Sequence, residues 1–300
     1  MLNILITGGS GMIGSRLTKM LLAKGHAVSH LERSKKDSAV STFKWDVTAG
    51  IVDKAAFKGI DTIVHLAGAG IADKRWSHDR KKEILESRTQ STSLLFDTLK
   101  EGGHQVKTFV CASAIGYYGI ECSDRPIIES DAAGTDFLAH VTQRWEYESD
   151  KIRTLGLRVV NVRTGIVLSK TGGALPKLLT PVKLYVGAPL GSGTQMMSWI
   201  HIDDHCGILI KAIEDQKLSG AYNSVAPHPV SNEVLTRAIA KVVHRPIIIP
   251  RVPSFVLRAL LGEMASTVTI GCNVSSAKIE ATGYVFQYRD VEEAIEAALK

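Results

Sequence analysis

The stretch Leu2-Asn3-Ile4-Leu5-Ile6-Thr7-Gly8-Gly9-Ser10-Gly11-Met12-Ile13-Gly14 decides the fold. It joins an aliphatic run of strand length, residues 2–6, to a segment, residues 12–24, whose apolar side chains recur with helical spacing. Gly8, Gly11 and Gly14 have the spacing G-x-x-G-x-x-G between the two. Glycines there permit a tight turn, a close approach of the backbone to a pyrophosphate, and close packing of helix on strand. The pattern predicts a dinucleotide-binding loop, with Met12 and Ile13 in the first helical turn; a purely structural turn is the alternative.

Strand-like and helix-like segments alternate beyond this loop. The expected strands are residues 26–31, 43–45, 62–66, 108–112 and 157–162, and the expected helices are residues 83–99 and 137–154. Such alternation is typical of a parallel sheet covered on both faces. The sequence therefore predicts an α/β protein with a Rossmann-type, doubly wound parallel sheet.

The composition changes after Arg163, because the sequence is rich in glycine and proline from there to Gly193. Strands are expected at residues 199–202 and 221–225, and helices at 203–214, at 235–242, from Ser254 and from Val291. We predict an NAD(P)-binding Rossmann domain over residues 1–168 plus 196–224. A smaller, interleaved α/β domain, which serves as substrate domain and lid, takes residues 169–195 plus 225–300.

The composition excludes several classes of protein. Hydrophobic residues make up 45% and charged residues 22% of the 300 residues, which rules out a disordered chain or a coiled coil. No apolar stretch reaches the ~20 residues of a membrane helix, and the amino terminus lacks the basic segment of a signal peptide. Four scattered cysteines, without a C-x-x-C pair, predict reduced thiols and a cytoplasmic protein.

The net charge of +6 raises the question of anionic partners. The densest basic cluster, residues 73–82, is interrupted by acids and is followed by a helical pattern. We therefore expect a small-molecule substrate and neither nucleic acid nor membrane as partner. A nucleic-acid binder that uses residues 74–82 is the weaker alternative.

The end of the second expected strand indicates which cofactor the loop would hold. It reads Leu31-Glu32-Arg33-Ser34. An acid at this place binds the 2′-hydroxyl of NAD, whereas an arginine accepts the 2′-phosphate of NADP. Arg33 followed by Ser34 favours NADP, because a guanidinium and a hydroxyl both suit a phosphate, and Glu32 keeps NAD open.

Several further motifs resemble one protein family. They are the glycine loop, Asp46, Ile63-Val64-His65-Leu66-Ala67-Gly68, residues 113–119, Trp145-Glu146, Val162-Arg163-Thr164-Gly165 and Trp199-Ile200-His201-Ile202-Asp203-Asp204. Together they resemble the extended (atypical) short-chain dehydrogenase/reductases of the NAD-dependent epimerase/dehydratase family. Finer motifs are similar to the epimerase-family branch sometimes labelled cell division inhibitor SulA; they are Ile71-Ala72-Asp73-Lys74-Arg75-Trp76, Ser87-Arg88, Gly116-Tyr117-Tyr118-Gly119 and Gly283-Tyr284-Val285-Phe286.

The resemblance implies roles for individual residues. Asp46 would lie near the adenine, and Leu66, Ala67 and Gly68 would line the ribose. Thr164 and Gly165 would lie near the nicotinamide. The expected function is that of an NADP-dependent oxidoreductase or a nucleotide-sugar-epimerase-like enzyme, acting as a monomer or homodimer.

The chain departs from the catalytic pattern of the superfamily. The positions of its tyrosine and lysine fall on Phe137 and Val141, that of its asparagine on Arg88, and that of its serine on Ala114. Phe137 and Val141 cannot move a proton. The same departure supports the alternative of a catalytically inactive NADP-binding redox sensor or scaffold.

Two tyrosines are the substitute candidates for catalysis. Our hypothesis is that Tyr117 or Tyr118, with Ser113 and a basic partner that lowers the phenol pKa, handles the proton. The candidates for that partner are Lys74, Arg75 and Arg88. The alternative is that both tyrosines pack at the seam between the domains.

The remaining candidates concern the substrate and a metal. Lys74 and Arg75, with Arg88, predict a polar or anionic substrate, and Trp76 either packs or stacks on it. His201, Asp203 and Asp204 span the start of a helix, where Asp caps, so no metal site is expected. His65 and Cys111 lie in buried strands and are expected to pack in the core.

Overall fold

The computed structural model describes residues 1–34, 40–120 and 125–300. A central sheet of eight strands has the order β11-β7-β6-β5-β1-β2-β3-β4. All neighbours are parallel except β4, which runs antiparallel to β3. The strands are β1 (Asn3–Thr7), β2 (Ala27–Glu32), β3 (Ser41–Asp46), β4 (Ile51–Val52), β5 (Thr62–His65), β6 (Thr108–Ala114), β7 (Arg158–Thr164) and β11 (Gly220–Ser224). The predicted doubly wound parallel sheet is confirmed.

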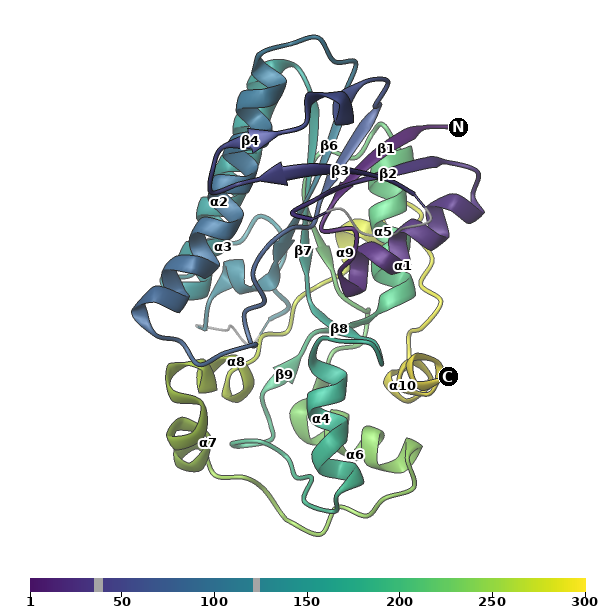
Figure 1. Ribbon diagram of the computed structural model, residues 1–300. Helices are drawn as coiled ribbons and strands as arrows, with labels where there is room; N and C mark the ends of the chain where they lie inside the picture. Colours follow the sequence, from purple (N-terminus) through teal and green to yellow (C-terminus); the bar gives the residue numbers. More distant parts are fainter. Residues whose placement is uncertain (35–39, 121–124) are drawn as a thin grey trace.

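Helices cover both faces of this sheet (Figure 1). On one face lie α1 (Met12–Ala23) and α5 (Ile202–Glu214), whose apolar sides share one core with β1, β6 and β7. On the other face lie α2 (His78–Lys100) and α3 (Phe137–Lys151), together with η1 (Lys54–Phe57) and η3 (Ile152–Leu155). Because helices bury it from both sides, a central strand such as β1 is aliphatic along its length, with Ile4, Leu5 and Ile6 fully buried.

A second group of elements lies at one end of the sheet, at the bottom of Figure 1. Helices α4 (Ala174–Lys183), α6 (Asn232–Val242) and α10 (Val291–Leu299) share a separate apolar core. Two separate two-stranded sheets complete the strands: β8 (Ile166–Leu168) is parallel to β10 (Trp199–His201), and β9 (Met196–Met197) is antiparallel to β12 (Val230–Ser231). The division into domains at residues 168, 195 and 224 stays a prediction.

The remaining elements are short. They are η2 (Ile115–Tyr118), α7 (Ser254–Leu261), η4 (Gly262–Ala265), α8 (Ser266–Thr269) and α9 (Ala277–Glu280). Within the described ranges, none of the helices is long and apolar enough to cross a membrane.

One predicted helix begins earlier in the structure than its apolar pattern indicated. The pattern predicts a start at residue 83, whereas α2 begins at His78. Ser77 caps the helix, because its Oγ accepts a hydrogen bond from the amide of Arg80 at 3.1 Å. The first turn is polar and carries charged residues, so the periodic apolar pattern starts only after it.

Candidate functional site

The glycine loop connects β1 to α1. At Gly14, the last glycine of the motif, the structure leaves no room for a side chain. Gly8 adopts a φ of +69°, and its carbonyl oxygen accepts a hydrogen bond from the amide of Gly11 at 3.0 Å. A Cβ atom on Gly14 would lie 2.7 Å from Cα and 2.8 Å from the carbonyl oxygen of Gly9, and closer still to the carbonyl oxygen of Gly8. The first turn of α1 is therefore held directly against the end of β1, where its free amide groups can meet an anion.

A cavity of about 740 Å³ opens over this loop, at the carboxyl ends of β1, β2 and β5. Ligands of open parallel sheets bind at this edge. Six of the predicted cofactor residues line this cavity: Gly8, Gly11, Arg33, Leu66, Ala67 and Gly68. The opposite wall comes from α2, through residues such as Ser87 and Ser91.

The other predicted cofactor residues lie outside the lining of this cavity. Met12 packs on the 172–173 turn, Ile13 packs against the core, and Gly14 and Ser34 are also outside it. Asp46 accepts a hydrogen bond from the amide of Ala49 at 3.0 Å and so caps the turn after β3. Its neighbours Trp45 and Val47 do line the cavity.

Thr164 is the last residue of β7 and Gly165 follows it; neither lines the cavity over the glycine loop or a smaller cavity beside α3. The amide of Gly165 donates a hydrogen bond to the carbonyl oxygen of Ser224 at 3.0 Å. A Cβ atom on Gly165 would collide with the backbone of Ser198. The backbone at Gly165 therefore packs directly against the backbone of Ser198, which leaves no room for a side chain at this position.

Glu32 and Arg33, at the end of β2, have different surroundings: Glu32 is hydrogen-bonded to the glycine loop, whereas Arg33 is exposed. Both carboxylate oxygens of Glu32 accept hydrogen bonds from Ser10, at 2.8 Å from the amide and 2.9 Å from the hydroxyl. The carboxylate thus already holds the glycine loop. Arg33 is exposed and lines the cavity.

Arg88 is a buried cation beside the same cavity. Its side chain lies against Gly68, and its Nη1 donates a hydrogen bond to the carbonyl oxygen of Ile84 at 2.9 Å. Its guanidinium also lies 5.0 Å from the centre of the Trp145 ring. Among the described residues, no carboxylate lies within 4.0 Å of it. Burial, and then the charge of Arg80, lower the pKa of Arg88 to about 10, so it stays protonated at neutral pH.

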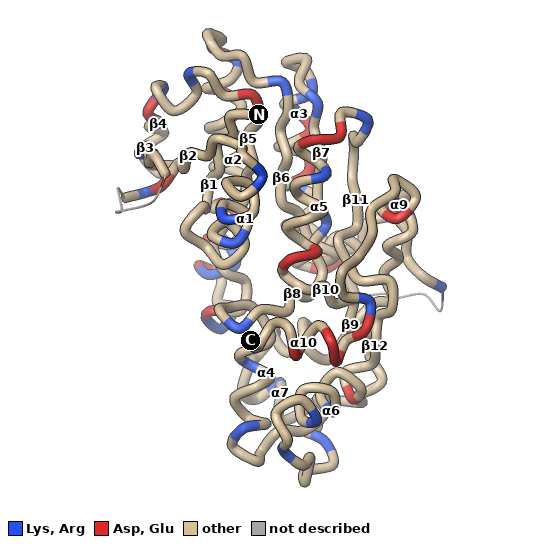
Figure 2. The backbone as a smooth tube through the Cα atoms, turned by 90° about the vertical axis from the view of Figure 1, so that its right-hand side faces the viewer, with Lys and Arg blue, Asp and Glu red and all other residues tan. Residues whose placement is uncertain are grey.

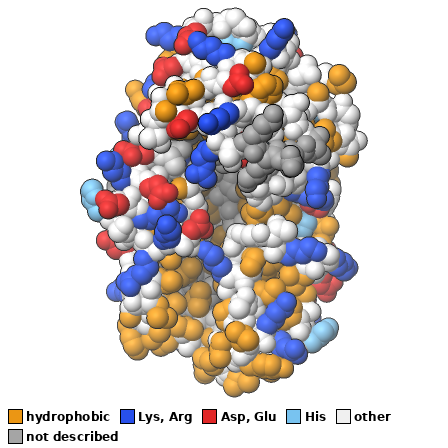
Figure 3. All heavy atoms as spheres, viewed as in Figure 1, with side chains coloured by type: hydrophobic (Ala, Val, Ile, Leu, Met, Phe, Trp, Pro, Cys, Tyr) orange, Lys and Arg blue, Asp and Glu red, His pale blue; other side chains and the backbone are white. Residues whose placement is uncertain are grey.

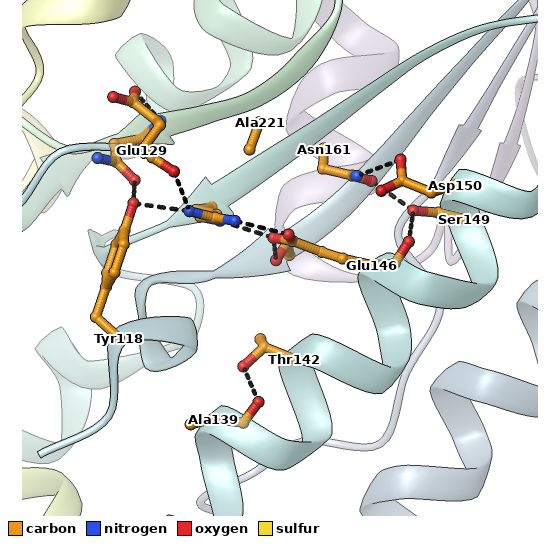
Figure 4. A network of polar contacts seen from close by, with 12 residues as sticks. Tyr118, Glu129, Ala139, Thr142, Glu146, Ser149, Asp150, Asn161 and Ala221 are labelled. Carbon is orange, nitrogen blue, oxygen red and sulfur yellow. Dashed lines mark hydrogen bonds and ion pairs between the residues drawn. The ribbon is translucent and has the colours of Figure 1, made fainter. Parts of the chain in front are cut away.

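A buried polar network lies behind the ends of β6 and β7 (Figure 4). Arg163 forms a two-pronged ion pair with Glu146, with both N–O distances 2.8 Å. Glu146 also accepts a hydrogen bond of 2.6 Å from Ser113, and Arg163 donates one of 3.0 Å to the hydroxyl of Tyr118. That hydroxyl in turn donates to Asn223 at 2.7 Å. The network therefore ties α3, β6, β7 and β11 together.

Tyr118 belongs to this network and Tyr117 packs beside it; neither lines the cavity over the glycine loop or a smaller cavity beside α3. Burial raises the pKa of Tyr118 to about 12, because it outweighs the opposing effect of Arg163. The expected lowering of a phenol pKa is therefore wrong for Tyr118. The cation beside the Tyr118 hydroxyl is Arg163, and not one of the three basic residues proposed from the sequence, which are Lys74, Arg75 and Arg88. Tyr117 packs its ring under the Arg163 guanidinium, 3.5 Å from the ring centre.

A second cavity, of about 320 Å³, lies between the sheet and the lower group of elements. It opens at the carboxyl ends of β6 and β7, beside the first turn of α3. Phe137, at the superfamily tyrosine position, lines it together with Trp76; their ring centres are 5.0 Å apart. Val141, at the lysine position, is buried inside the protein.

Lys74 and Arg75 do not line this second cavity. Arg75 lies beside Gly262, since a Cβ atom there would be 3.0 Å from its Nη2. Trp76 donates a hydrogen bond from Nε1 to the carbonyl oxygen of Ile71 at 2.9 Å, which fixes its ring at the rim. Of the three predicted substrate residues, the structure brings only Trp76 to the cavity.

Acidic neighbours pair with several members of the basic cluster. Arg80 lies 2.6 Å from Glu83, and Lys81 pairs with Glu263. Basic and acidic positions are interspersed along the whole backbone in Figure 2. These ion pairs offset the charges of Arg80 and Lys81 within the cluster.

His65 and Cys111 pack in the core as predicted. His65 is hydrogen-bonded to Thr7 at 2.7 Å and to Ser91 at 3.1 Å, and burial lowers its pKa to about 3. Burial raises the pKa of the Cys111 thiol, which makes it unreactive. The expectation of four reduced cysteines is wrong at Cys272, which is disulfide-bonded.

The trio at the start of α5 has structural roles. His201 caps the helix by accepting a hydrogen bond from the amide of Asp203 at 3.1 Å. Asp203 pairs with Arg16 at 2.6 Å, and buried Asp204 accepts a hydrogen bond from the hydroxyl of Tyr284 at 3.1 Å. Over residues 1–34, 40–120 and 125–300, no group of three possible metal ligands gathers.

The ion pair between Glu146 and Arg163 was not predicted from the sequence. Both residues stood in motifs that resembled the family, yet no charge pairing was inferred. A usable signal was present: Arg163 directly follows the apolar run of β7, where a buried cation requires a partner. Asp136, which caps α3 and lines the second cavity, was also missed.

Comparisons with known proteins agree with this geometry. The model of the NAD dependent epimerase/dehydratase family matches residues 4–225, and that of a domain of unknown function (DUF1731) matches residues 252–298. The chain is 38% identical over 296 residues to an epimerase family protein of Mycobacterium leprae, which covers 98% of this chain and 95% of that one.

Two further relatives extend the comparison. An Arabidopsis thaliana protein, the chloroplastic homolog of epimerase family protein SDR39U1, is 36% identical over 308 residues, which cover 100% of this chain and 87% of that one. The crystal structure of human SDR39U1 (isoform 2) with NADPH superimposes with a TM-score of 0.88 at 30% identity and covers 99% of both chains. UDP-glucuronic acid 4-epimerase from Bacillus cereus, at 16% identity and a TM-score of 0.82, shares the fold.

Proposed function

Because the chain belongs to the NAD-dependent epimerase/dehydratase family, we propose that it is an NADP-dependent oxidoreductase. It would exchange a hydride with a small molecule held in the second cavity. One observation carries this proposal: a cavity at the sheet edge lies over a glycine loop in which Gly14 has no room for a Cβ atom. The same cavity extends to Arg33. When bound, the cofactor supplies or accepts the hydride.

Each predicted cofactor residue has a role in this proposal. Backbone amides of Gly8, Gly11 and the first turn of α1, with Met12, Ile13 and Gly14, would hold the pyrophosphate. Leu66, Ala67 and Gly68 line the ribose side, and Asp46 fixes the turn beside the adenine. Thr164 and Gly165 would lie on the nicotinamide side, where Gly165 packs closely against the backbone of Ser198.

The preference for NADP over NAD is supported by the end of β2. Glu32 already accepts two hydrogen bonds from Ser10, so its carboxylate is engaged by the glycine loop. Arg33, exposed at the cavity and followed by Ser34, offers a guanidinium and a hydroxyl to a 2′-phosphate. The related human protein was crystallised with NADPH.

The residues proposed for catalysis divide into two kinds. Ser113 and Tyr118 would act as positioning residues, because their hydroxyls are committed to Glu146 and Asn223. Arg88 would place a positive charge beside the cofactor cavity. A role of Tyr117 in proton transfer stays a prediction, and it is the one phenol of the pair whose hydroxyl the network does not use.

A second candidate function is NADP binding without turnover, as in a redox sensor or scaffold. The observation that favours it is the pair Phe137 and Val141 at the positions of the superfamily tyrosine and lysine. The location in the cytoplasm and the monomeric or homodimeric state remain predictions for either candidate.

Turnover discriminates between the two candidates. Purified protein is incubated with NADPH and a panel of carbonyl compounds, and the loss of NADPH absorbance is followed. Steady oxidation that depends on one compound, and that needs a higher NADPH concentration in Gly14→Ala, supports the oxidoreductase. A protein that binds NADPH but oxidises it with none of the panel supports the sensor.

A further inference from the structure

We propose that the second cavity takes an uncharged, largely apolar carbonyl or alcohol compound and excludes sugar nucleotides and other anions. This inference names the substrate class for the proposed function and rests on it. It also replaces the polar or anionic substrate that Lys74 and Arg75 predicted.

Apolar side chains predominate in the walls of the cavity. The sheet side contributes Ile115 and Ile166, and α3 contributes Phe137 and Leu138. Met197 and Ile270 close the side formed by the lower elements. A volume of about 320 Å³ lies at the small end of ligand pockets, which span ~300–1,000 Å³. Such a site favours a compact molecule that gains affinity by burying apolar surface.

The hydroxyl groups in the wall are committed to the protein backbone. Ser198 donates a hydrogen bond to the carbonyl oxygen of Cys272 at 2.7 Å, and Ser266 donates one to that of Glu263 at 2.9 Å. Thr267 donates to the carbonyl oxygen of Met264 at 2.7 Å. A ligand with many hydroxyls or phosphate oxygens would lose its hydration and find few partners here.

The charges of the wall point the same way. Among the described residues, no lysine or arginine lines this cavity, and its ionisable carboxyl groups are Asp136 and Glu263. Glu263 pairs with Lys81, whose ammonium lies 5.2 Å from the centre of the Phe137 ring, so that cation is already balanced. Asp136 caps α3 through Oδ1, while its buried Oδ2 has no hydrogen-bond partner in the described part of the chain. An anion in this cavity would be repelled by the carboxylate of Asp136, which has no cationic partner among the described residues.

An uncharged fluorescent probe tests this inference by binding rather than by turnover. N-phenyl-1-naphthylamine is titrated into the wild type and into Ile270→Trp, which enlarges a side chain of the wall and narrows the cavity. A second variant, Gly116→Ala, adds one methyl group to the wall, 3.3 Å from Cβ of Leu138. Ile248→Trp is the matched control, because Ile248 is 66% exposed and lines neither cavity. Exposed hydrophobic side chains are common at the lower end of the molecule in Figure 3, so one more is tolerated there. Melting temperature and NADPH affinity are measured for each protein.

We expect saturable binding to the wild type that Ile270→Trp weakens about tenfold or more and Gly116→Ala weakens by a smaller factor. Ile248→Trp leaves it unchanged, and UDP-glucuronic acid does not displace the probe. If Ile270→Trp fails to fold, Gly116→Ala carries the test. The inference is overturned if the wild type does not bind the probe, if the cavity variants bind it as well as the wild type, or if UDP-glucuronic acid displaces it. If the wild type binds the probe but does not bind NADPH, the proposed function is refuted, whereas the inference that the second cavity binds apolar compounds still holds.

Discussion

Replacement of Gly14 by alanine should disturb both the packing of the glycine loop and the binding of the cofactor. The added Cβ would lie 2.7 Å from Cα of Gly9, whereas two carbon atoms in contact stay about 3.5 Å apart. The loop must therefore move away from α1 by at least about 0.8 Å, because the carbonyl oxygen of Gly8 is closer still, and the atoms that must give way are backbone atoms. Such overpacking costs about 3 kcal/mol, which corresponds to a fall in melting temperature of about 6 °C.

The same movement displaces the amide groups that would meet the pyrophosphate. Loss of one hydrogen bond to a charged group costs about 1.5–3 kcal/mol, so the affinity for NADPH should fall about 10- to 150-fold. Thermal unfolding and calorimetric titration measure the two effects. Gly11→Ala is the control, because its Cβ would meet only the carbonyl oxygen of Gly8, at 3.2 Å. We expect it to lose less than about 1 kcal/mol of stability. A Gly14→Ala protein with wild-type melting temperature and NADPH affinity would refute the reasoning.

Three further predictions concern buried groups. Glu146→Gln leaves the guanidinium of Arg163 unpaired, so we expect a loss of about 3–5 kcal/mol in denaturant unfolding; a loss under 1 kcal/mol would show that the pair is dispensable. Tyr118→Phe removes a hydroxyl that bridges Arg163 and Asn223 and should cost about 1–3 kcal/mol of stability while NADPH affinity stays unchanged; a fall in affinity alone would contradict the positioning role. His65 has a pKa of about 3 in the folded protein, so the unfolded chain takes up a proton first as the pH falls below about 6.5, and stability declines by up to about 1.4 kcal/mol per pH unit. His65→Asn should remove that part of the slope between pH 6 and 4.5, and an unchanged slope in urea titrations would count against this account.

Local pattern was sufficient to predict the first half of the fold. The aliphatic run ending at Ile6, the glycine spacing and the apolar stripe of α1 act over a few residues, so one strand–turn–helix unit follows from the sequence alone. The buried strand β5 and the core role of His65 followed from the same logic. These features depend on neighbours in the chain and not on distant partners.

The candidate site depended on contacts that no local pattern encodes. Glu146 and Arg163 are 17 residues apart and meet only because α3 packs behind β7. The second cavity is closed by residues near 197 and 270, which lie far from α3 in the sequence. Lys74 and Arg75 stand beside Trp76 in the sequence, yet only Trp76 reaches the cavity, since the direction of a loop side chain is set by its tertiary neighbours.

The central claim, an NADP site at the glycine loop, is tested most directly by calorimetric titration with NADPH and NADH in parallel. The proteins are the wild type, Arg33→Ala and, as the control, Arg251→Ala, which removes an exposed arginine outside both cavities. We predict that the wild type binds NADPH at least about tenfold more tightly than NADH and that Arg33→Ala alone abolishes the difference. A preference for NADH would assign the ribose to Glu32, and the absence of binding by either nucleotide would contradict the account.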